Sequence, residues 1–325
     1  MPNRKFILLN RPKGLPKESD FKLIEEENIS LNKGELRLDT KWISLDPYMR
    51  GSMNERVDIG NTMIGETIGK VIESRSEKIP TDSLVLCKSG WQTQPITNAE
   101  NVSIIDTRIQ PISLSLGALG MPGLTAYFGL LRLGRPIQGE TVVISAGSGA
   151  VGAVVGQIAK NEKCRVVGIA GSDQKVKYMK DKLGFDEGIN YKLPSWKYDF
   201  RKICPSSVDI YFDNVGGEIS DVVIEEMNSG ARVLVCGQIS QYNNEVQELG
   251  PRNLGNFLWK KAKLQGFMVS DYINEYEEGI DYLLSLKKSS KLTFRETIIE
   301  GFDNTPSAFI KLFHGQNFGK LLIKI

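Results

Sequence analysis

The sequence predicts an α/β protein built around a doubly wound parallel sheet, and three observations support this fold class. A β-branched run at residues 141–145 is followed by a glycine-rich turn and a helical apolar pattern. After residue 160, apolar runs alternate with helical segments, as expected of a parallel sheet covered on both faces. Residues 1–115 contain short strand-like runs punctuated by glycine and proline, which predicts a β-rich N-terminal region. At 325 residues, two domains are the default expectation.

The strand, turn and helix at residues 141–160 predict a pyrophosphate-binding site. Gly147, Gly149 and Gly152 satisfy the pattern G-x-G-x-x-G between the strand and the helix. Glycines allow a tight turn and a close backbone approach, and the helix N-terminus offers free N–H groups to an anion. The alternative is a glycine-rich contact between helix and strand that binds no ligand. We expect the loop to bind a dinucleotide through these residues: Ala146, Gly147, Gly149, Ala150, Val151 and Gly152.

The remaining elements are predicted from apolar runs and their spacing. Helices are expected within residues 111–134 and 273–284 and between Pro306 and Gly315. Strands are expected at these runs: residues 164–170, 208–214, 231–237, 263–269 and 320–325.

Charge and hydropathy exclude several classes of partner. The net charge of +2 is close to balance, which argues against nucleic acid or an anionic membrane surface as the main partner. The apolar run near the N-terminus is too short for a signal peptide, and no uninterrupted apolar run is long enough to span a bilayer. We therefore expect a cytoplasmic protein.

Cysteine and histidine usage argues against a zinc site, so no metal is expected. The four cysteines, Cys87, Cys164, Cys204 and Cys236, are scattered and form no C-x-x-C pair. His314 is the only histidine. Its position near the end of a predicted helix favours a role at the helix C-terminus over one in chemistry.

The end of the second strand indicates which dinucleotide is bound. Sites for NAD place a carboxylate there to bind the ribose 2′-hydroxyl. Here the strand ends Ile169-Ala-Gly-Ser172 without an acid, and Lys175 follows in the next turn, where it could meet a 2′-phosphate. Asp173 is expected to cap the helix at residues 174–183. The alternative for Lys175 is a solvated lysine at a helix start.

Taken together, several segments resemble one known family along nearly the whole chain. The chain resembles the zinc-independent medium-chain dehydrogenase/reductase branch that includes leukotriene B4 12-hydroxydehydrogenase/prostaglandin reductase and the double-bond reductases. One departure is Ser52, which stands where the family usually has a second arginine. The matching segments are Asp46-Pro-Tyr-Met-Arg50, Met121-Pro-Gly-Leu-Thr-Ala-Tyr127, Ser145-Ala-Gly-Ser-Gly-Ala-Val-Gly152, Gly171-Ser-Asp-Gln-Lys175, Asn190-Tyr-Lys192, Tyr211-Phe-Asp-Asn-Val-Gly-Gly217, Cys236-Gly-Gln-Ile-Ser-Gln-Tyr-Asn243 and Gly315-Gln-Asn-Phe-Gly-Lys320.

The resemblance implies a domain organisation and an assembly. A GroES-like β-rich domain is expected at residues 1–117 and 292–325, with a dinucleotide-binding Rossmann domain inserted at residues 118–291. A homodimer is expected from the resemblance and is also the commonest symmetric assembly.

The resemblance also implies site residues. Lys175 and Tyr191 would hold the 2′-phosphate, and Tyr48 would line the substrate pocket. On general grounds, Tyr191 is equally well explained as a half-buried aromatic at a strand end, and Tyr48 as packing in the domain core. The other cofactor contacts expected from the matching segments are Gly171, Ser172, Asn214, Cys236, Gly237, Ile239, Tyr242, Phe267, Met268 and Asn317. For Phe267 and Met268 the alternative is strand core, and for Asn317 it is a turn residue before Gly319.

The chemistry expected follows from the missing zinc ligands. Hydride transfer to a carbonyl carbon usually needs polarisation by a metal or an acid, whereas hydride addition to the β-carbon of an enone produces an enolate that a few hydrogen-bond donors can stabilise. Tyr242 and Tyr48 are the expected catalytic residues. Tyr242 follows the carboxyl end of the strand at residues 231–237, where ligands bind in open α/β sheets. The alternative for Tyr242 is an exposed loop tyrosine.

The sequence therefore predicts an NADPH-dependent, zinc-free reductase of activated C=C bonds in small-molecule α,β-unsaturated ketones or aldehydes. A quinone reductase is the nearest enzymatic alternative. A dinucleotide-binding protein without turnover is an alternative from another class. A zinc alcohol dehydrogenase is disfavoured by the absent ligands.

Overall fold

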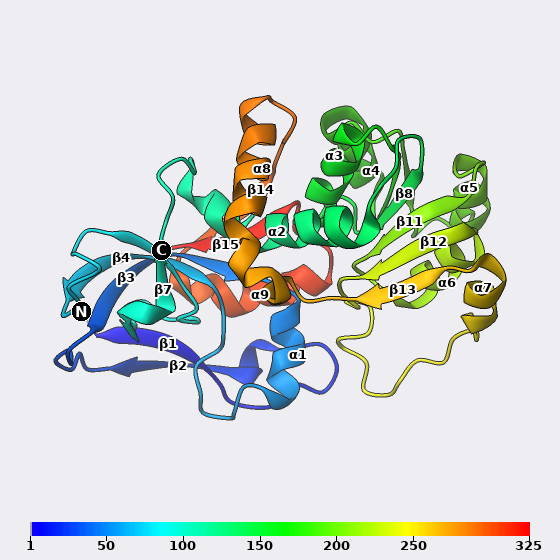
Figure 1. Ribbon diagram of the computed structural model, residues 1–325. Coiled ribbons are helices and arrows are strands. Elements are labelled where there is room, and N and C mark those ends of the chain that lie inside the picture. Colours follow the sequence, from blue (N-terminus) through cyan, green and yellow to red (C-terminus); the bar gives the residue numbers. More distant parts are fainter. Residues whose placement is uncertain (1) are drawn as a thin grey trace. The chain divides into compact units, whose positions relative to one another are not determined.

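The structure is a computed structural model that describes residues 2–325, and it divides into two compact units (Figure 1). One unit consists of Met1–Leu116 together with Glu296–Ile325, and the other of Gly117–Arg295. We call them the β-rich unit and the dinucleotide unit and describe each by itself.

A seven-stranded sheet forms the centre of the β-rich unit. Its strand order is β14-β15-β3-β4-β5-β7, with β6 paired to β3, and β1 and β2 form a separate antiparallel pair. Two α-helices, α1 (Tyr48–Glu55) and α9 (Thr305–Phe313), accompany the sheets. The strands are β1 (Asn3–Leu8), β2 (Phe21–Glu26), β3 (Glu35–Leu45), β4 (Thr67–Ser74), β5 (Leu84–Cys87), β6 (Ile96–Asn98), β7 (Val102–Ile104), β14 (Glu296–Glu300) and β15 (Lys320–Lys324). Short 3₁₀ turns are found at Glu18–Asp20, Ala99–Asn101, Ile112–Leu116 and Phe302–Asn304.

The two ends of the chain are joined in the core of this unit. β15 pairs antiparallel with β3 and parallel with β14, so the C-terminal segment completes a sheet begun near residue 35. Trp91 is fully buried and packs against Phe21 and, edge to face, against Phe309. Buried aromatic rings of this kind contribute strongly to stability because they remove a large apolar area from water.

The dinucleotide unit contains a six-stranded, all-parallel sheet in the order β10-β9-β8-β11-β12-β13. In sequence order this arrangement is 3-2-1-4-5-6, the Rossmann topology, whose strand order reverses between β8 and β11. The α/β fold with a Rossmann sheet and a β-rich N-terminal region is thus confirmed. The strands are β8 (Thr141–Ser145), β9 (Arg165–Ala170), β10 (Glu187–Asn190), β11 (Val208–Asp213), β12 (Met227–Val235) and β13 (Lys263–Gly266).

Helices cover both faces of this sheet because its strands are apolar on both sides. On one face, α5 and α6 bury Phe200 and Val223 against the strand residues Val167 and Tyr211. On the other face, α3 packs so closely on the segment after α4 that Gly156 lies against the ring of Phe185. The helices are α2 (Met121–Tyr127), a π-helical turn Phe128–Gly134, α3 (Gly152–Asn161), α4 (Asp173–Leu183), α5 (Trp196–Ile203), α6 (Gly217–Glu225), α7 (Leu254–Lys260), a 3₁₀ segment Val269–Glu275 and α8 (Tyr276–Lys288).

Two predicted elements differ from the structure in extent. The strand expected at residues 263–269 ends at Gly266, and the helix expected at residues 273–284 is divided into the 3₁₀ segment and α8. Tyr272, inside the 3₁₀ segment, has non-helical backbone angles. Its ring stacks on Phe128 with centroids 4.5 Å apart, so tertiary packing overrides the helical periodicity here.

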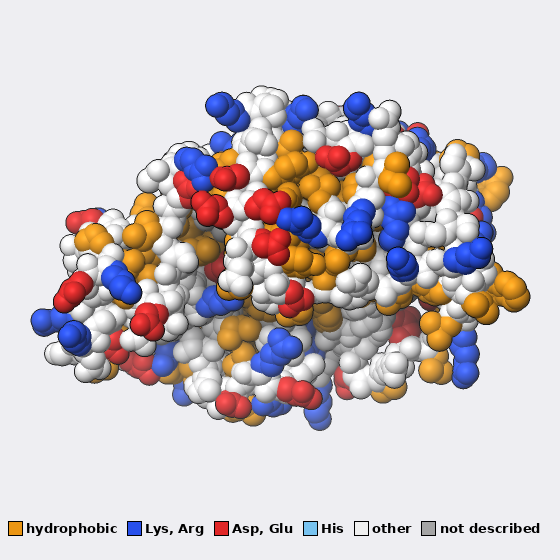
Figure 2. All heavy atoms as spheres, viewed as in Figure 1, with side chains coloured by type: hydrophobic (Ala, Val, Ile, Leu, Met, Phe, Trp, Pro, Cys, Tyr) orange, Lys and Arg blue, Asp and Glu red, His pale blue; other side chains and the backbone are white. Residues whose placement is uncertain are grey.

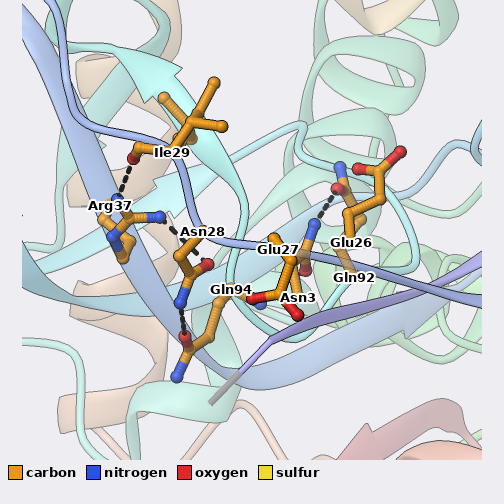
Figure 3. Close-up of a pocket in the computed structure, with 9 residues that line it drawn as sticks. Asn3, Glu26, Glu27, Asn28, Ile29, Arg37, Gln92 and Gln94 are labelled. Carbon is orange, nitrogen blue, oxygen red and sulfur yellow. Dashed lines mark hydrogen bonds between the residues drawn. The ribbon is translucent and has the colours of Figure 1, made fainter.

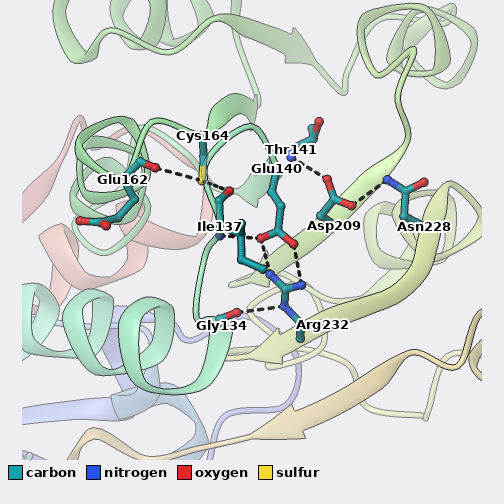
Figure 4. A network of polar contacts seen from close by, with 9 residues as sticks. All are labelled: Gly134, Ile137, Glu140, Thr141, Glu162, Cys164, Asp209, Asn228 and Arg232. Carbon is teal, nitrogen blue, oxygen red and sulfur yellow. Dashed lines mark hydrogen bonds and ion pairs between the residues drawn. The ribbon is translucent and has the colours of Figure 1, made fainter.

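A polar network holds the end of the parallel sheet opposite the glycine turn (Figure 4). Arg232 of β12 donates two hydrogen bonds to Glu140 and one to the carbonyl of Gly134, at 2.9 Å. Glu140 also accepts from the backbone N–H of Ile137 at 2.8 Å. Both charges are largely buried, and the bidentate geometry joins β12 to the loop before β8.

Candidate functional site

The turn after β8 is a tight turn held by backbone hydrogen bonds. Ala146 has a positive φ of 50°, which is uncommon for a residue other than glycine. The backbone N–H of Gly147 donates to the carbonyl of Ile169 on β9 at 3.0 Å, and that of Gly149 donates to the carbonyl of Ala146 at 2.9 Å. The chain then enters α3 at Gly152. These contacts bring the turn back over the sheet and direct the helix N-terminus outwards.

The three glycines of the motif have different physical roles. A Cβ atom on Gly147 would lie 2.7 Å from the sulfur of Met179, and one on Gly152 would lie 2.4 Å from the carbonyl oxygen of Ala146. These two positions need glycine for packing within the protein. At Gly149 the nearest heavy atom is the Ala146 oxygen at 3.1 Å, and the next lies 3.9 Å away. Gly149 is therefore the least crowded of the three glycines, and a Cβ there would meet only Ala146.

The N-terminus of α3 can bind an anion. The first N–H groups of a helix have no partner within the helix, and its dipole favours negative charge. Val151 precedes the helix without a side-chain cap. The backbone N–H groups of Ala153 and Val154 already donate to the carbonyls of Gly149 and Val151, each at 3.0 Å, so an anion here would bind the N–H groups before them. The strand, turn and helix that the sequence predicts are present, and the binding of a pyrophosphate to them stays a prediction.

The end of β9 differs in one detail from the sequence prediction. Ser172, not Asp173, caps α4: its Oγ accepts from the backbone N–H of Lys175 at 3.3 Å, and the helix begins at Asp173. Asp173 instead accepts from the side-chain amide of Asn190 at 2.8 Å. The prediction of Asp173 as the cap was wrong because the extended backbone of Ser172 puts its own hydroxyl above the helix end.

Two lysines and a tyrosine meet beside this cap. A Cβ atom on Gly171 would lie 3.2 Å from the ring of Tyr191 and 3.3 Å from Cε of Lys192. Lys175, in the first turn of α4, lies near Lys192: burial, and then the like charge of Lys192, lower the pKa of Lys175. No acid stands at the tip of β9. Two ammonium groups and a serine hydroxyl are a donor set suited to a phosphate.

Lys192 is a residue that the sequence prediction missed, although it belongs to a segment that carries the resemblance. It lies 17 positions after Lys175, and only the parallel pairing of β10 with β9 brings the two together. A lysine directly after a third strand is the one signal that could have indicated it.

Asp213 accepts hydrogen bonds from several segments at the place where the strand order of the sheet reverses. It stands at the end of β11, is 2% exposed, and has no counterion among its hydrogen-bonded partners. Its carboxylate is held instead by many donors, which can stabilise a buried charge without an ion pair. The donors are the hydroxyls of Ser145 (3.1 Å), Tyr211 (2.9 Å) and Ser220 (2.7 Å), the amide of Gln238 (3.1 Å) and the backbone N–H groups of Val215 (3.0 Å) and Gly216 (2.9 Å).

The same network fixes the loop after β12. The backbone N–H groups of Cys236 and Gly237 donate to the carbonyl of Asp213 at 2.8 and 3.1 Å. Asn214 donates its side-chain amide to the carbonyl of Ser145 at 2.8 Å and accepts at its carbonyl from the N–H of Ile239 at 3.5 Å. The structure thus brings together four of the predicted cofactor contacts, Asn214, Cys236, Gly237 and Ile239, beside the glycine turn.

Tyr242 lies on this loop, half-buried, and its hydroxyl is positioned by the backbone. The hydroxyl oxygen accepts a hydrogen bond from the N–H of Gln238 at 3.2 Å. Burial raises the pKa of Tyr242, with smaller contributions from Cys236 and Asp213. The phenol is therefore neutral and can donate its proton in a further hydrogen bond.

Three other residues predicted to contact the cofactor make contacts within the protein or have a raised pKa. Burial, and then the charge of Asp213, raise the pKa of the Cys236 thiol to about 12, so it is not a nucleophile at neutral pH. The ring of Phe267 packs edge to face on Phe212 with centroids 6.0 Å apart. Met268 is exposed, and its backbone N–H donates to Asp271 at 3.2 Å.

Tyr48 and Asn317 belong to the β-rich unit. Tyr48 begins α1, and burial, followed by the charges of Asp46 and Glu66, raises the pKa of its phenol well above the usual range. Asn317 donates its side-chain amide to the carbonyl of Gly319 at 3.0 Å, which closes a turn before β15.

The β-rich unit also has a polar pocket of about 440 Å³ (Figure 3). Arg37 is buried there and donates to Glu73, to the side chain of Asn28 and to the carbonyl of Ile29. Its lining includes Gln92 and Gln94 but none of the residues predicted to bind cofactor or substrate.

Neither a metal centre nor a membrane-spanning helix is found in residues 2–325. They contain no group of three or more His, Cys, Asp or Glu side chains placed to hold a metal ion. In the same residues, every helix is too short or too polar to cross a membrane.

Comparisons with known proteins identify the family of the chain. Residues 4–105 match a family model described as the N-terminal domain of oxidoreductase, and residues 150–285 match one described as zinc-binding dehydrogenase. A putative NADP-dependent oxidoreductase of Bacillus subtilis is 45% identical, over 98% of this chain and 96% of its own. An NADPH-dependent curcumin reductase of Escherichia coli is 40% identical, over 99% and 97%. Prostaglandin reductase 1 of Oryctolagus cuniculus is 43% identical, over 94% and 89%.

A solved structure extends the likeness to three dimensions. The crystal structure of CurA from Vibrio vulnificus in complex with NADPH superposes with a TM-score of 0.95, at 39% identity and over 99% of this chain and 98% of that one. The chain belongs to the medium-chain dehydrogenase/reductase family, in the zinc-independent branch of the double-bond reductases.

Proposed function

We propose that the protein reduces activated C=C bonds of small α,β-unsaturated ketones and aldehydes, using NADPH and no zinc. The observation that carries the choice of cofactor is the pair Lys175 and Lys192 beside the Ser172 hydroxyl, with no acid at the tip of β9. A 2′-phosphate finds compensating charge there, whereas the 2′-hydroxyl of NADH finds no carboxylate.

When bound, NADPH supplies a hydride to the β-carbon of the substrate. The residues of the protein bind the cofactor and polarise the substrate. The glycine turn and the start of α3 would hold the pyrophosphate, close to Gly149, the least crowded of the three glycines. Tyr242, held by the Gln238 N–H, donates its hydroxyl proton in a hydrogen bond to the oxygen where the enolate charge develops. A positioned donor of this kind stabilises the transition state more than the ground state.

The relatives support this class of reaction. The names of three of them refer to the reduction of curcumin, of prostaglandins and of 2-alkenals, and two names specify NADPH or NADP⁺. A 2-alkenal carries a C=C bond conjugated to an aldehyde, the arrangement that makes the β-carbon an acceptor of hydride.

The experiment is an acceptor panel measured with the purified protein. NADPH oxidation is followed with enones, enals and quinones, and NADPH binding is titrated separately by fluorescence. We expect turnover with enones or enals to exceed that with quinones. Turnover confined to quinones would replace the proposal with a quinone reductase, and NADPH binding without turnover on any acceptor would indicate a non-catalytic dinucleotide-binding protein.

We further propose a cytoplasmic homodimer joined at the edge of the Rossmann sheet. Within residues 2–325, strand β13 pairs only with β12, and its four residues are exposed. Large apolar side chains surround this edge, as the orange atoms over α7 and β13 show (Figure 2). Trp259 is 80% exposed, and an open, apolar strand edge favours pairing with a second chain. The exposed apolar residues of α7 and β13 are Leu254, Leu258, Trp259 and Leu264, and the loop before α7 adds Val246 and Leu249.

A further inference from the structure

A series of hydrogen bonds connects the buried carboxylate of Asp213 with the hydroxyl of Tyr242 through Gln238, in the loop after β12. The side-chain amide of Gln238 donates to Asp213 at 3.1 Å and to the carbonyl of Gly237 at 3.2 Å. An amide nitrogen carries two hydrogens, so one side chain can make both donations at once. The backbone N–H of Gln238 donates to the Tyr242 hydroxyl at 3.2 Å. All four residues belong to the dinucleotide unit.

The peptide group between Gly237 and Gln238 is the middle member of this series. Its carbonyl accepts from the Gln238 amide, and its N–H donates to Tyr242. A carbonyl that accepts a hydrogen bond polarises its peptide group, which strengthens the N–H as a donor. Glycine leaves the backbone more conformational freedom than any other residue, so contacts beyond Gly237 are needed to fix the direction of this N–H. The Gln238 amide supplies such a contact.

Gly216 provides the place in which the Gln238 side chain lies. A Cβ atom on Gly216 would lie 2.1 Å from Oε1 of Gln238, and Gly216 has a φ of 74°, in the left-handed region. The N–H of Gly216 donates to Asp213 at 2.9 Å, so the glycine and the glutamine are bound to the same buried carboxylate. The amide of Gln238 is therefore held between a fixed carboxylate and a backbone position that requires glycine.

Other bonds hold the start of this loop independently of the Gln238 side chain. The backbone N–H groups of Cys236 and Gly237 donate to the carbonyl of Asp213 at 2.8 and 3.1 Å. These bonds join backbone groups, so they remain when Gln238 is replaced. Loss of the Gln238 amide should therefore disturb the Tyr242 hydroxyl more than the contacts that the loop is expected to make with the cofactor.

The bond from the Gln238 N–H determines how the Tyr242 hydroxyl can act. A hydroxyl that accepts at its oxygen directs its own hydrogen toward a different partner. Burial raises the pKa of Tyr242, and the bond from Gln238 acts in the opposite direction because it stabilises negative charge on the oxygen. A hydroxyl that is oriented and made more acidic in this way is a better donor to a developing enolate.

We propose that Gln238 is a positioning residue whose side-chain amide, bound to Asp213, orients the backbone N–H that holds the Tyr242 hydroxyl as a donor. The inference rests on the proposed function, in which Tyr242 donates a hydrogen bond to the enolate oxygen. Gln238 gives up no proton and acts only through Tyr242. Its effect on the rate should therefore disappear when the Tyr242 hydroxyl is absent.

The test compares Gln238→Met, Tyr242→Phe and the double variant in steady-state kinetics with NADPH and one enone. Methionine has nearly the length of glutamine but no N–H donor. Gln238→Met should lower kcat roughly threefold to tenfold and leave NADPH affinity within about twofold, because the hydroxyl remains but is no longer oriented. In the Tyr242→Phe background, the same substitution should change kcat little further. Gln241→Met is the matched control, since the Gln241 amide donates to Ser240 and Glu248.

A second readout needs no substrate. Carbon-13 NMR of protein labelled at tyrosine Cζ gives one signal that is missing from Tyr242→Phe. We expect Gln238→Met to shift this signal and Gln241→Met to leave it unchanged. If Gln238→Met does not fold, Gln238→Ala removes the same amide without placing a longer side chain against Gly216, and the same shift is expected.

The two readouts separate this inference from the proposed function. If the Tyr242 signal shifts in the Gln238 variant but the wild type reduces no acceptor, the proposed function fails and the hydrogen-bond series stands. The inference is overturned by an unchanged Tyr242 signal or an unchanged kcat in a folded Gln238 variant. A loss of kcat that is equally large with and without the Tyr242 hydroxyl would overturn it as well, because it would show that Gln238 does not act through Tyr242.

Discussion

Lys175 of α4 and Lys192, which follows β10, come from different elements, yet Lys192 lies close enough for its charge to act on Lys175. Burial and the charge of Lys192 together lower the pKa of Lys175. An anion bound beside both lysines would be attracted by two positive charges. The 2′-phosphate of NADPH is such an anion.

Lys175→Ala and Lys192→Ala should each weaken NADPH binding and leave NADH binding nearly unchanged. A charge-assisted contact to phosphate is worth roughly 1.5–3 kcal/mol, which corresponds to a loss of about tenfold to a hundredfold in affinity. Fluorescence titration of both cofactors measures this. Lys182→Ala, an exposed lysine on the same helix, is the matched control and should change neither affinity. Equal affinity of the unmutated protein for the two cofactors would rule out the phosphate site.

Tyr242→Phe should lower kcat and kcat/KM together, by roughly tenfold to a hundredfold, because it removes a donor used mainly in the transition state. The ring remains, so packing and NADPH affinity should change little. Steady-state kinetics with a good enone measures the rate, and Tyr198→Phe, at an exposed tyrosine, serves as the control. An unchanged kcat, with a deuterated cofactor showing that hydride transfer limits the rate, would leave Tyr242 as a lining residue.

Prolonged chelation should leave activity intact, because the proposed chemistry uses hydrogen-bond donors in place of a Lewis acid. The measurement compares turnover before and after dialysis against EDTA and determines zinc by elemental analysis. Activity that is lost with EDTA and restored by zinc would contradict this prediction.

Trp259→Glu and Leu258→Glu should shift the protein from dimer to monomer, since a buried charge without a partner opposes the pairing of two β13 edges. Sedimentation velocity over a range of concentrations measures the shift. Leu193→Glu, at an exposed apolar residue far along the chain from this edge, should leave the dimer intact. A monomeric wild-type protein at micromolar concentration would contradict the proposed interface.

The stability of Glu66→Gln relative to the wild type should depend on pH. The pKa of Glu66 is raised from 4.5 to about 7 in the folded protein, so the folded state binds more protons than the unfolded state between these values. Wild-type stability is therefore lost as pH rises from about 5 to about 8, by on the order of 1–3 kcal/mol, whereas the glutamine of the variant does not titrate. Urea unfolding of both proteins at pH 5 and pH 8 measures the difference, and a gap that does not change with pH would refute it.

Local patterns predicted much of the fold and part of the site. The β-branched run at residues 141–145 and its glycines predict β8, the turn and α3, because strand, turn and helix signals all lie within twenty residues. Lys175 was found because it is close in sequence to the tip of β9. These features depend on short-range periodicity and on the topology rule that places ligands at the carboxyl ends of parallel strands.

The remaining features depend on strand pairing, which a single sequence does not determine. Lys192 reaches Lys175 only because β10 lies beside β9, and Glu66 reaches Asp46 only through the register of β3 with β4. The six donors of Asp213 come from the ends of β8 and β11, from α6 and from the loop after β12. Nothing in the spacing of these residues indicates that they meet.

The central claim is that hydride goes to the β-carbon of a conjugated substrate. It is tested most directly with NADPH carrying deuterium at the C4 position of the nicotinamide, on either face, and an enone as acceptor, with the product examined by NMR and mass spectrometry. The account predicts that, for one of the two labelled faces, a saturated ketone forms with a single deuterium on the former β-carbon. Deuterium on the former carbonyl carbon of an allylic alcohol would contradict the account.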